Sequence, residues 1–303
     1  MKLTVITPVF NGEEYLAGTV DSVLANLADK DFEYIVVNDG STDGSLSILE
    51  GYKNQIILLS QENQGQSSAI NTALRVAKGD LCMIVNADDP ITNPYIYEFS
   101  VEYFAKDSEI VATYPWWSVI NANGEVLTTI QPPVFSNLNL IGRGNCLLGP
   151  GSFFRLDKAL EIGGWNVNYK FMPDYDFWLR LSRRGKIVQI PKILATWRHH
   201  VGSTSVSGSG EALAKERITI TAAFVDEYKV GKLLSSIALT NAYIDSLKLS
   251  MKDFSIPKKI KVLRVLQNRP AVVLFPNFWV ITLKYSIPKP IFAKLVNFKN
   301  QFK

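Results

Sequence analysis

The feature that most constrains the fold is the alternation of extended and helical patterns over the first 90 residues. Short apolar runs, typical of buried strands, alternate with segments whose apolar residues recur at the spacing of one helix face. This order predicts an α/β fold with a mostly parallel central sheet flanked by helices. The predicted strands cover residues 3–10, 32–38, 56–60 and 81–85, and the predicted helices cover residues 13–28, 43–52 and 67–78.

Two later regions interrupt this alternation. Within residues 111–130, Asn123 and Gly124 stand between apolar residues, which is typical of a hairpin turn. We therefore expect a small antiparallel element beside the parallel sheet. Residues 211–251 have the pattern of one or two helices, and we expect a helical C-terminal extension over residues 206–303.

The end of the chain differs from the rest in charge. Residues 251–303 contain nine lysines and two arginines against Asp253 alone, a net charge of +10, which leaves −6 for the first 250 residues. Residues 271–283 are apolar but include Pro276 and are too few to span a bilayer. This basic tail is compatible with an anionic membrane surface or with packing against the body. No nucleic-acid-binding motif accompanies the charge, so we expect no nucleic-acid partner.

The cysteines and the N-terminal segment indicate the cellular compartment of the protein. Cys82 and Cys146 are the two cysteines, and we expect both to be unpaired thiols in a reducing compartment. The N-terminal segment lacks the long apolar run of a signal peptide. We expect a cytoplasmic protein, in contact with the inner face of the membrane if the tail binds lipid.

Polar residues follow all four predicted parallel strands. Any one such group is typical of a turn. Because ligands of open parallel sheets gather at the carboxyl ends of the strands, four groups together favour a ligand site. The groups are Pro8 with Asn11, then Asn38, Asp39 and Gly40, then Gln61, Asn63 and Gln64, and finally Asp88 with Asp89.

Common nucleotide and hydrolase motifs are missing from the sequence. No GxGxxG pattern follows the first strand, and neither GxxxxGK[ST] nor GxSxG occurs anywhere. Dinucleotide, P-loop and serine-hydrolase functions therefore lose support. The acidic pair Asp88 and Asp89 would suit a hard divalent cation that carries phosphates.

A series of motifs resembles family 2 glycosyltransferases of the GT-A fold over about residues 1–205. The first half contains TPVFNGEEYL, YIVVNDGSTDGS, NQGQSSAINTALRVAKGD and IVNADDP. The second half contains GPGSFFRLDKALEIGGWN, MPDYDFWLRLSRRGKIVQIP and LATWRHHVGS. The resemblance implies a GT-A domain over residues 1–205, with a nucleotide-binding half at 1–90 and an acceptor half at 91–205.

The resemblance also implies an activity. A family 2 enzyme moves a sugar, with inversion, from a UDP- or GDP-linked donor to a glycan or lipid-linked acceptor, using Mn²⁺ or Mg²⁺. Synthesis of surface polysaccharide is the expected setting. Carried over by position, the nucleotide-binding residues are Thr7, Pro8, Val9, Glu13, Asp39, Gln66, Asn86, Ala87 and Asp88.

The metal motif of the family falls on Asn86, Ala87 and Asp88, so its first acid is replaced by asparagine here. The resemblance therefore assigns the metal to Asp88, with Asp89 as a further candidate. His200 occupies the position of a metal-ligating histidine in the family. A lone histidine is more often structural, and both roles stay open for His200.

The catalytic base is expected within MPDYDFWLRL, where the family has Glu-Asp and this chain has Pro173 and Asp174. We assign Asp174 as the base that accepts the proton of the acceptor hydroxyl. Its alternative role is a helix N-cap. Asp176 is the second candidate, although an ion pair with Arg180 one helical turn later would explain it equally well.

Aromatic residues offer faces on which an acceptor sugar could stack. Such faces could come from Trp165, Tyr169, Trp116 and Trp117, although core packing would explain most of them, and we assign Trp165 to the acceptor site. Two other functions compete with the enzyme. The chain could bind a nucleotide sugar without turnover, which Asn86 and Pro173 would favour. A phosphoacceptor signalling domain is the remote alternative. The acidic pair of such a domain normally follows the first strand, whereas the pair in this chain follows the fourth.

Overall fold

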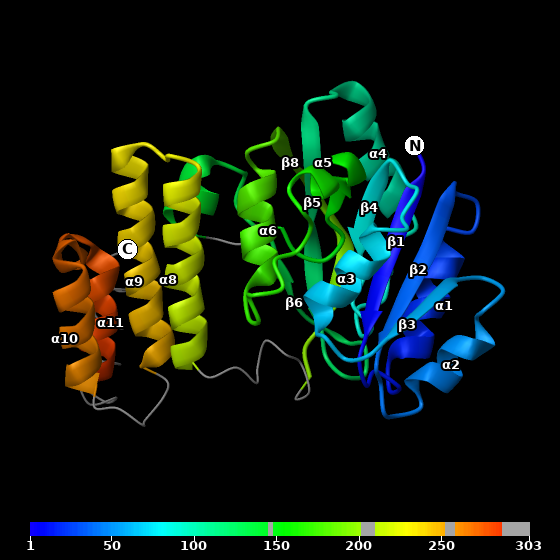
Figure 1. Ribbon diagram of the computed structural model, residues 1–303, viewed down its shortest axis with the longest axis horizontal. Helices are drawn as coiled ribbons and strands as arrows, with labels where there is room; N and C mark the ends of the chain where they lie inside the picture. The colour runs from blue at the N-terminus through cyan, green and yellow to red at the C-terminus, as the bar shows by residue number, and fades with distance from the viewer. Residues whose placement is uncertain (145–147, 201–209, 252–257, 287–303) are drawn as a thin grey trace. The chain divides into compact units, whose positions relative to one another are not determined.

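The computed structural model describes residues 1–144, 148–200, 210–251 and 258–286. The chain forms two compact units. The N-terminal unit comprises Met1–Ser136 and Cys146–Val206, and the C-terminal unit comprises Asn137–Asn145 and Ser207–Lys303 (Figure 1). The domain boundary expected between residues 205 and 206 stays a prediction.

The N-terminal unit begins with the predicted alternation. Its parallel strands are β1 (Leu3–Val9), β2 (Phe32–Asp39), β3 (Ile57–Gln61) and β4 (Leu81–Ile84). The helices between them are α1 (Leu16–Asn26), α2 (Ser45–Gly51) and α3 (Gln66–Leu74). All seven residues of β1 are buried, because β1 pairs with β2 and β4 and helices cover the sheet.

The second part of the unit adds antiparallel strands. It contains α4 (Ile96–Lys106), β5 (Ile110–Ile120), β6 (Val126–Ile130), β7 (Phe153–Arg155), α5 (Leu156–Glu161), α6 (Pro173–Leu181) and β8 (Lys186–Arg198). The described strands form an eight-stranded sheet in the order β3-β2-β1-β4-β7-β5-β6, and β8 pairs with β5 in parallel. The predicted α/β fold with a mostly parallel sheet is confirmed. The predicted hairpin is also present between β5 and β6, where Gly124 has a φ of +86°.

The two faces of the sheet are covered by different helices. One core cluster joins alternate residues of β1 and β4 to apolar residues of α1, α2 and α4. Because side chains alternate along a strand, Cys82 on β4 points away from this cluster. Cys82 is buried and free, and burial raises the pKa of its thiol, so the thiol is protonated. Cys146 lies outside the described residues.

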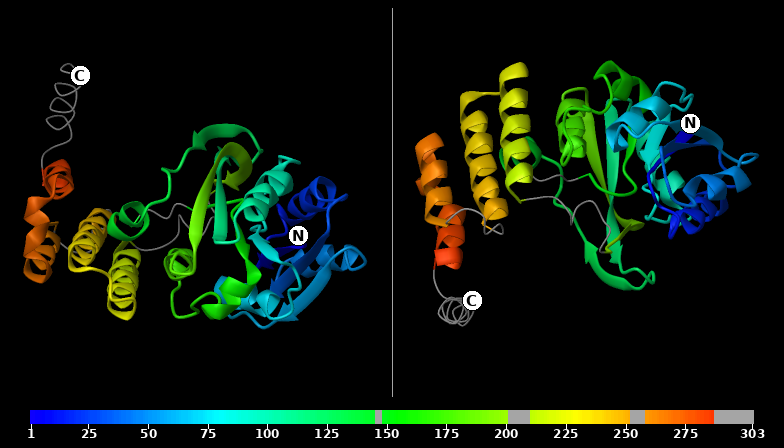
Figure 2. Two further views of the ribbon diagram at one scale, coloured as in Figure 1. Left: turned by 90° about the horizontal axis from the view of Figure 1, so that it is seen from above. Right: turned by 60° about the horizontal axis from the view of Figure 1, so that its bottom comes forward.

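The C-terminal unit is helical in its described residues. It contains η1 (Leu138–Gly142), α8 (Gly210–Glu227), α9 (Lys232–Ser250), α10 (Lys258–Asn268), η2 (Pro270–Leu274) and α11 (Pro276–Ser286). Helices α8 and α9 lie side by side (Figure 2). No helix within the described ranges is long and apolar enough to cross a membrane.

The apolar stretch at residues 271–283 splits between core and surface. Val272, Phe278 and Ile281 pack in a cluster with residues of α9 and α10. Leu274 and Trp279 are exposed, and the indole N–H of Trp279 donates to the carbonyl of Val273 at 2.8 Å. The stretch is therefore part of the folded C-terminal unit, and it also presents an apolar surface.

Candidate active site

The carboxyl ends of β1, β2 and β4 meet at one edge of the sheet, and the chain after β8 returns to the same place. The paired acids after β4 are held there by residues from the end of β8, more than 100 positions later. This return is a consequence of the parallel pairing of β5 with β8, which continues to Arg198.

Asp89 is the anchor of this site. It is 5% exposed, and its two carboxylate oxygens accept hydrogen bonds from the backbone N–H of Arg198 at 2.7 Å and the side-chain amide of Asn86 at 2.9 Å. Burial and the neighbouring charge of Asp88 together raise the pKa of the Asp89 carboxyl to about 7, although the two hydrogen bonds oppose the rise. Asp89 thus fixes the turn after β4 to the end of β8.

Asp88, next to it, contacts His200. The Oδ2 atom of Asp88 lies 2.9 Å from Nε2 of His200, at hydrogen-bonding distance. Both side chains are partly exposed, at 28% for Asp88 and 20% for His200. The structure therefore brings together the two residues assigned to the metal from sequence, as an accessible carboxylate and imidazole.

Arg198 connects the surrounding loops. Its Nε atom donates to the carbonyl of Asp88 at 2.9 Å, and its Nη1 atom donates to the carbonyls of Asn121 and Ala122 in the β5–β6 turn. The guanidinium carbon lies 4.6 Å from the centre of the Tyr15 ring. Sequence reasoning gave Arg198 and Tyr15 no role, although they lie within the motifs LATWRHHVGS and TPVFNGEEYL.

Asn86 serves as a bridge between two segments. Its Oδ1 atom accepts a hydrogen bond from Nε2 of Gln66, the first residue of α3, at 2.9 Å. Its Nδ2 atom donates to Asp89, as described above. The asparagine at the first position of the metal motif is thus occupied by protein partners on both sides, while Ala87 between the two positions packs on the core.

Asp39 holds the loop after β3. It is buried, and its carboxylate accepts hydrogen bonds from the side chain of Gln61 at 2.8 Å and from the backbone N–H groups of Gln64 and Gly65 at 2.9 and 2.8 Å. Gly65 has a φ of +88°, which favours glycine. Asp39 therefore shapes the entry to α3, next to the position assigned to the nucleotide.

The residues after β1 are tied to the loop after β2. Glu13 accepts a hydrogen bond from the backbone N–H of Gly44 at 2.6 Å. Asn11 has a φ of +53°, and its side-chain oxygen accepts the backbone N–H of Thr42 at 2.7 Å. These contacts bring the two loops together at the edge where the strands end.

The residues of β1 assigned to the nucleotide have buried side chains. The hydroxyl of Thr7 lies 2.9 Å from the hydroxyl of Tyr34 on β2. Pro8 and Val9 are buried as well. These three residues lie at the carboxyl end of β1, beneath the loops that follow the parallel strands.

Helix α6 carries the second acidic pair. Asp174 is exposed in the first turn, and the N-cap position is Met172, so Asp174 is not the cap. Asp176 is buried and pairs with Arg180 at 2.6 Å, and Arg180 also donates to the carbonyls of Ile162 and Gly164. The structure thus supplies the ion pair that sequence reasoning offered as the alternative role of Asp176.

Trp165, assigned to the acceptor, belongs to an aromatic cluster. Its ring stacks on Phe177 with centroids 3.6 Å apart and an interplanar angle of 16°, and Phe154 and Trp178 surround the pair. The backbone of Trp165 exchanges two hydrogen bonds with the side chain of Asn71. Because Trp165 is 5% exposed, its ring faces are covered by protein.

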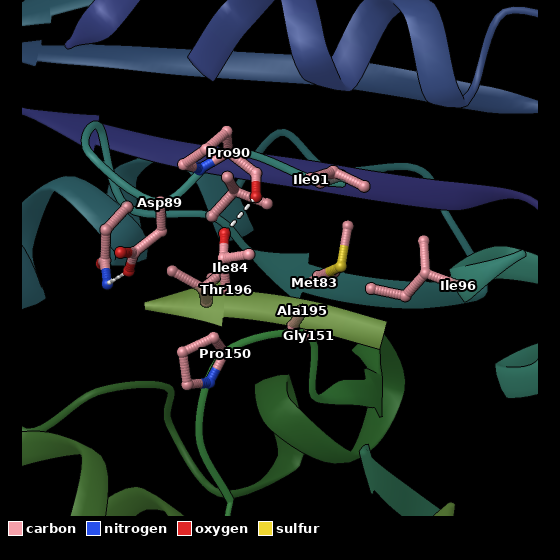
Figure 3. Close-up of a pocket in the computed structure, with 12 residues that line it drawn as sticks. Met83, Ile84, Asp89, Pro90, Ile91, Ile96, Pro150, Gly151, Ala195 and Thr196 are labelled. Atoms are coloured by element: carbon pink, nitrogen blue, oxygen red, sulfur yellow. Dashed lines mark hydrogen bonds between the residues drawn. The ribbon is translucent and has the colours of Figure 1, made fainter. Parts of the chain in front are cut away.

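A small pocket of about 20 Å³ lies behind Asp89 (Figure 3). Apolar residues of β4 line it together with Pro150, Gly151 and Thr196, whose hydroxyl donates to the carbonyl of Pro90. A volume of this size holds about one water molecule. The pocket is therefore too small for a sugar or nucleotide.

The sequence profile of glycosyl transferase family 2 matches residues 4–158, just over half of the chain. The chain belongs to glycosyl transferase family 2. It is a glycosyltransferase, and the resemblance stated from its motifs is confirmed. The match includes β1 to β4 and the Asp88–Asp89 turn, and it ends in α5.

Relatives and solved structures extend the similarity along the chain. An uncharacterized glycosyltransferase of Rickettsia typhi is 24% identical over 299 residues, which cover 95% of this chain and 91% of the relative. S. aureus TarS 1–349 in complex with UDP-GlcNAc has the same fold, with a TM-score of 0.62, 20% identity and coverage of 94% and 91%. A mannosyltransferase from Pyrobaculum calidifontis in complex with GDP-Man and Mn²⁺ matches with a TM-score of 0.55, 18% identity and coverage of 94% and 84%.

The donor atoms of this glycosyltransferase suit a divalent cation with few protein ligands. No group of three His, Cys, Asp or Glu side chains arranged for a metal occurs among the described residues. Asp88 and His200 offer one oxygen and one nitrogen, ligand types that Mn²⁺ accepts, while both oxygens of Asp89 are engaged by protein N–H groups. Such a pair fits a cation whose other ligands are phosphate oxygens and water.

Proposed function

We propose that this glycosyltransferase transfers a hexosyl group, with inversion, from a UDP- or GDP-linked sugar to a glycan or lipid-linked acceptor in surface polysaccharide synthesis. The observation that carries the proposal is the pairing of Asp88 with His200 at the carboxyl edge of the parallel strands. The complexes of UDP-GlcNAc with TarS and of GDP-Man and Mn²⁺ with the mannosyltransferase support this donor class.

The nucleotide would lie along the loops after β1, β2 and β4. The backbone of residues 7–9 and the Glu13 loop would border the nucleoside, and Gln66, Asn86 and Ala87 would face the phosphates. Asp39 would accept an N–H of the base. A carboxylate can accept about four hydrogen bonds, and Asp39 uses three within the protein.

Asp88 and His200 would hold Mn²⁺ or Mg²⁺. When bound, the cation stabilises the charge that develops on the leaving nucleoside diphosphate. Asp89 and Arg198 keep the Asp88 backbone in place for this role. These contacts would keep the Asp88 carboxylate in one position, which a group that stabilises charge in the transition state requires.

Asp174 would accept the proton of the acceptor hydroxyl as the new glycosidic bond forms. Its exposure at the start of α6 makes it accessible, and the positive end of the helix favours its ionised form. Asp176 is bound to Arg180 and would hold the helix in place. The aromatic cluster around Trp165 would support the acceptor side from below.

The experiment is release of UDP or GDP from a panel of nucleotide sugars in the presence of Mn²⁺. We expect release from one donor class, with loss of release in Asp88→Asn. A protein that binds the donor with Mn²⁺ dependence but releases nothing, even with acceptor extracts, would be a binding protein. Asn86 and Pro173, which replace acids of the family motifs, favour that second function.

We also propose that the C-terminal unit contacts an anionic membrane surface on the cytoplasmic side. Leu274 is 79% exposed, beside Val273 and Trp279, in a segment that carries a net charge of +10. Apolar side chains next to basic residues are typical of surfaces that bind anionic lipid.

Co-sedimentation with vesicles tests the membrane contact. We expect binding to vesicles that contain anionic lipid, weaker binding at high salt, and weaker binding of Leu274→Ser. Leu233→Ser is the matched control, since Leu233 is 77% exposed in the same unit. Equal binding of the two variants, or equal binding to neutral vesicles, would contradict the proposal.

A further inference from the structure

Tyr15 occupies a position that its own helix does not explain. It is the N-cap residue of α1, where Ser, Thr, Asp or Asn normally supply a side-chain hydrogen bond. Tyr15 makes no such bond. The ring of Tyr15, by contrast, contacts residues at the end of β8.

The ring of Tyr15 touches two residues that hold the Asp88–Asp89 turn. The Arg198 guanidinium carbon lies 4.6 Å from the ring centre, at cation–π distance. The imidazole of His200 lies on it as well, with ring centroids 5.0 Å apart and an interplanar angle of 53°. Tyr15 therefore contacts the residues immediately before and after His199 at the end of β8.

Those two residues reach the same aspartate by different atoms. Arg198 binds the carbonyl of Asp88, and His200 meets its carboxylate. The His200 imidazole therefore contacts the Tyr15 ring and the Asp88 carboxylate at the same time. Tyr15 lies between β1 and α1, and the next residue, Leu16, is fully buried in the core, which anchors the backbone that carries the Tyr15 ring.

We propose that Tyr15 is a positioning residue that holds His200 beside Asp88 before any ligand binds. The inference rests on the proposed function only for its consequence, which is tighter binding of the cation and nucleoside diphosphate. Its structural part concerns the protein alone. The contact is made by the ring face, so phenylalanine should replace Tyr15 and an aliphatic side chain should not.

The first measurement uses the protein without metal. The chain has two histidines, so the side-chain resonances of His200 are readily assigned by comparison with a His199→Gln variant. We expect a cross-relaxation contact between the rings of Tyr15 and His200. We also expect the His200 resonances to shift in Tyr15→Leu and to stay near the wild-type positions in Tyr15→Phe.

The second measurement is the Mn²⁺-dependent affinity for UDP and GDP. Loss of a residue that orients a metal ligand typically weakens binding by about 10–100-fold. We expect that loss in Tyr15→Leu, with Tyr15→Phe close to wild type. Tyr95→Leu is the control, because Tyr95 is exposed on the same unit and its ring pairs with Phe99.

The outcomes separate this inference from the proposed function. If wild type binds no nucleotide with Mn²⁺, the proposed function fails, while the His200 resonances still decide the role of Tyr15. Unchanged His200 resonances in Tyr15→Leu, or unchanged affinity where wild type binds, would overturn the inference. Should Tyr15→Leu fail to fold, absence of the Tyr15–His200 ring contact in wild type would overturn it.

Discussion

The turn after β4 and the first turn of α6 each carry two aspartates, and in each pair one acid is buried and the other is more exposed. Asp89 is bound by Arg198 and Asn86, and Asp176 is bound by Arg180. Asp88 and Asp174 are the acids that a ligand can reach. In each pair, the buried acid is tied to the protein by its partners, and its neighbour lies nearer the surface.

The two pairs reach this arrangement by different routes. On α6, Asp176 and Arg180 are one helical turn apart, so the partner is set by local sequence. In the β4 turn, Asp89 is held by a residue 109 positions later, and the partner is set by the sheet. Local sequence therefore predicts the ion pair of Asp176, whereas the bond between Asp89 and Arg198 depends on the sheet.

The largest effect should come from the exposed acid of α6. Asp174→Asn removes the proposed base and should lower the rate of sugar transfer by about 10²–10⁴-fold, with donor affinity near wild type. Single-turnover transfer measured beside donor affinity tests this. If Asp174→Asn keeps near-full transfer while folded Asp176→Asn is inactive, the two roles must be exchanged.

The buried acid of the same helix should affect stability first. Asp176→Asn leaves the guanidinium of Arg180 without its carboxylate and should lower the free energy of unfolding by about 1–3 kcal/mol. Urea denaturation measures the change. Glu102→Gln, which breaks the exposed pair with Lys106, is the control and should leave stability unchanged. A fully stable Asp176→Asn would contradict the assigned anchoring role.

A smaller stability change is expected at the other buried acid. Asp89→Asn keeps the shape of the side chain, and its remaining oxygen can still accept the backbone N–H of Arg198. Its new NH2 group, however, faces the NH2 group of Asn86 and cannot accept a hydrogen bond from it. Loss of one hydrogen bond should cost about 1 kcal/mol. Thermal unfolding at constant pH measures this loss. If Asp89→Asn lowers the free energy of unfolding by more than Asp176→Asn does, the predicted order of the two effects is wrong.

Much of the fold could be predicted because its signals are local. The strand and helix patterns of residues 1–85 follow from apolar periodicity, and Asn123 with Gly124 marks the β5–β6 hairpin. The pairing of β7 between β4 and β5 had no such signal, since it joins segments about 40 to 70 positions apart. The two sheet neighbours of β7 depend on tertiary packing.

The site was predicted in part for the same reason. Asp88 stands out as an acid at a strand end, but its pairing with His200 was expected from the family resemblance alone. Tyr15 and Arg198 gave no signal, because a ring face and a guanidinium acquire their roles through neighbours that the fold brings together. The packing of Trp165 on Phe177 likewise depends on the arrangement of α6.

The most direct test of the account is the equilibrium affinity for UDP and GDP, measured with and without Mn²⁺, in wild type and in Asp88→Asn. We predict that Mn²⁺ strengthens binding of one nucleotide to wild type. Asp88→Asn should keep its fold and lose at least about 10–100-fold of the Mn²⁺-dependent affinity. Unchanged Mn²⁺ dependence in folded Asp88→Asn would contradict the central claim that the exposed acid of the β4 turn holds the cation.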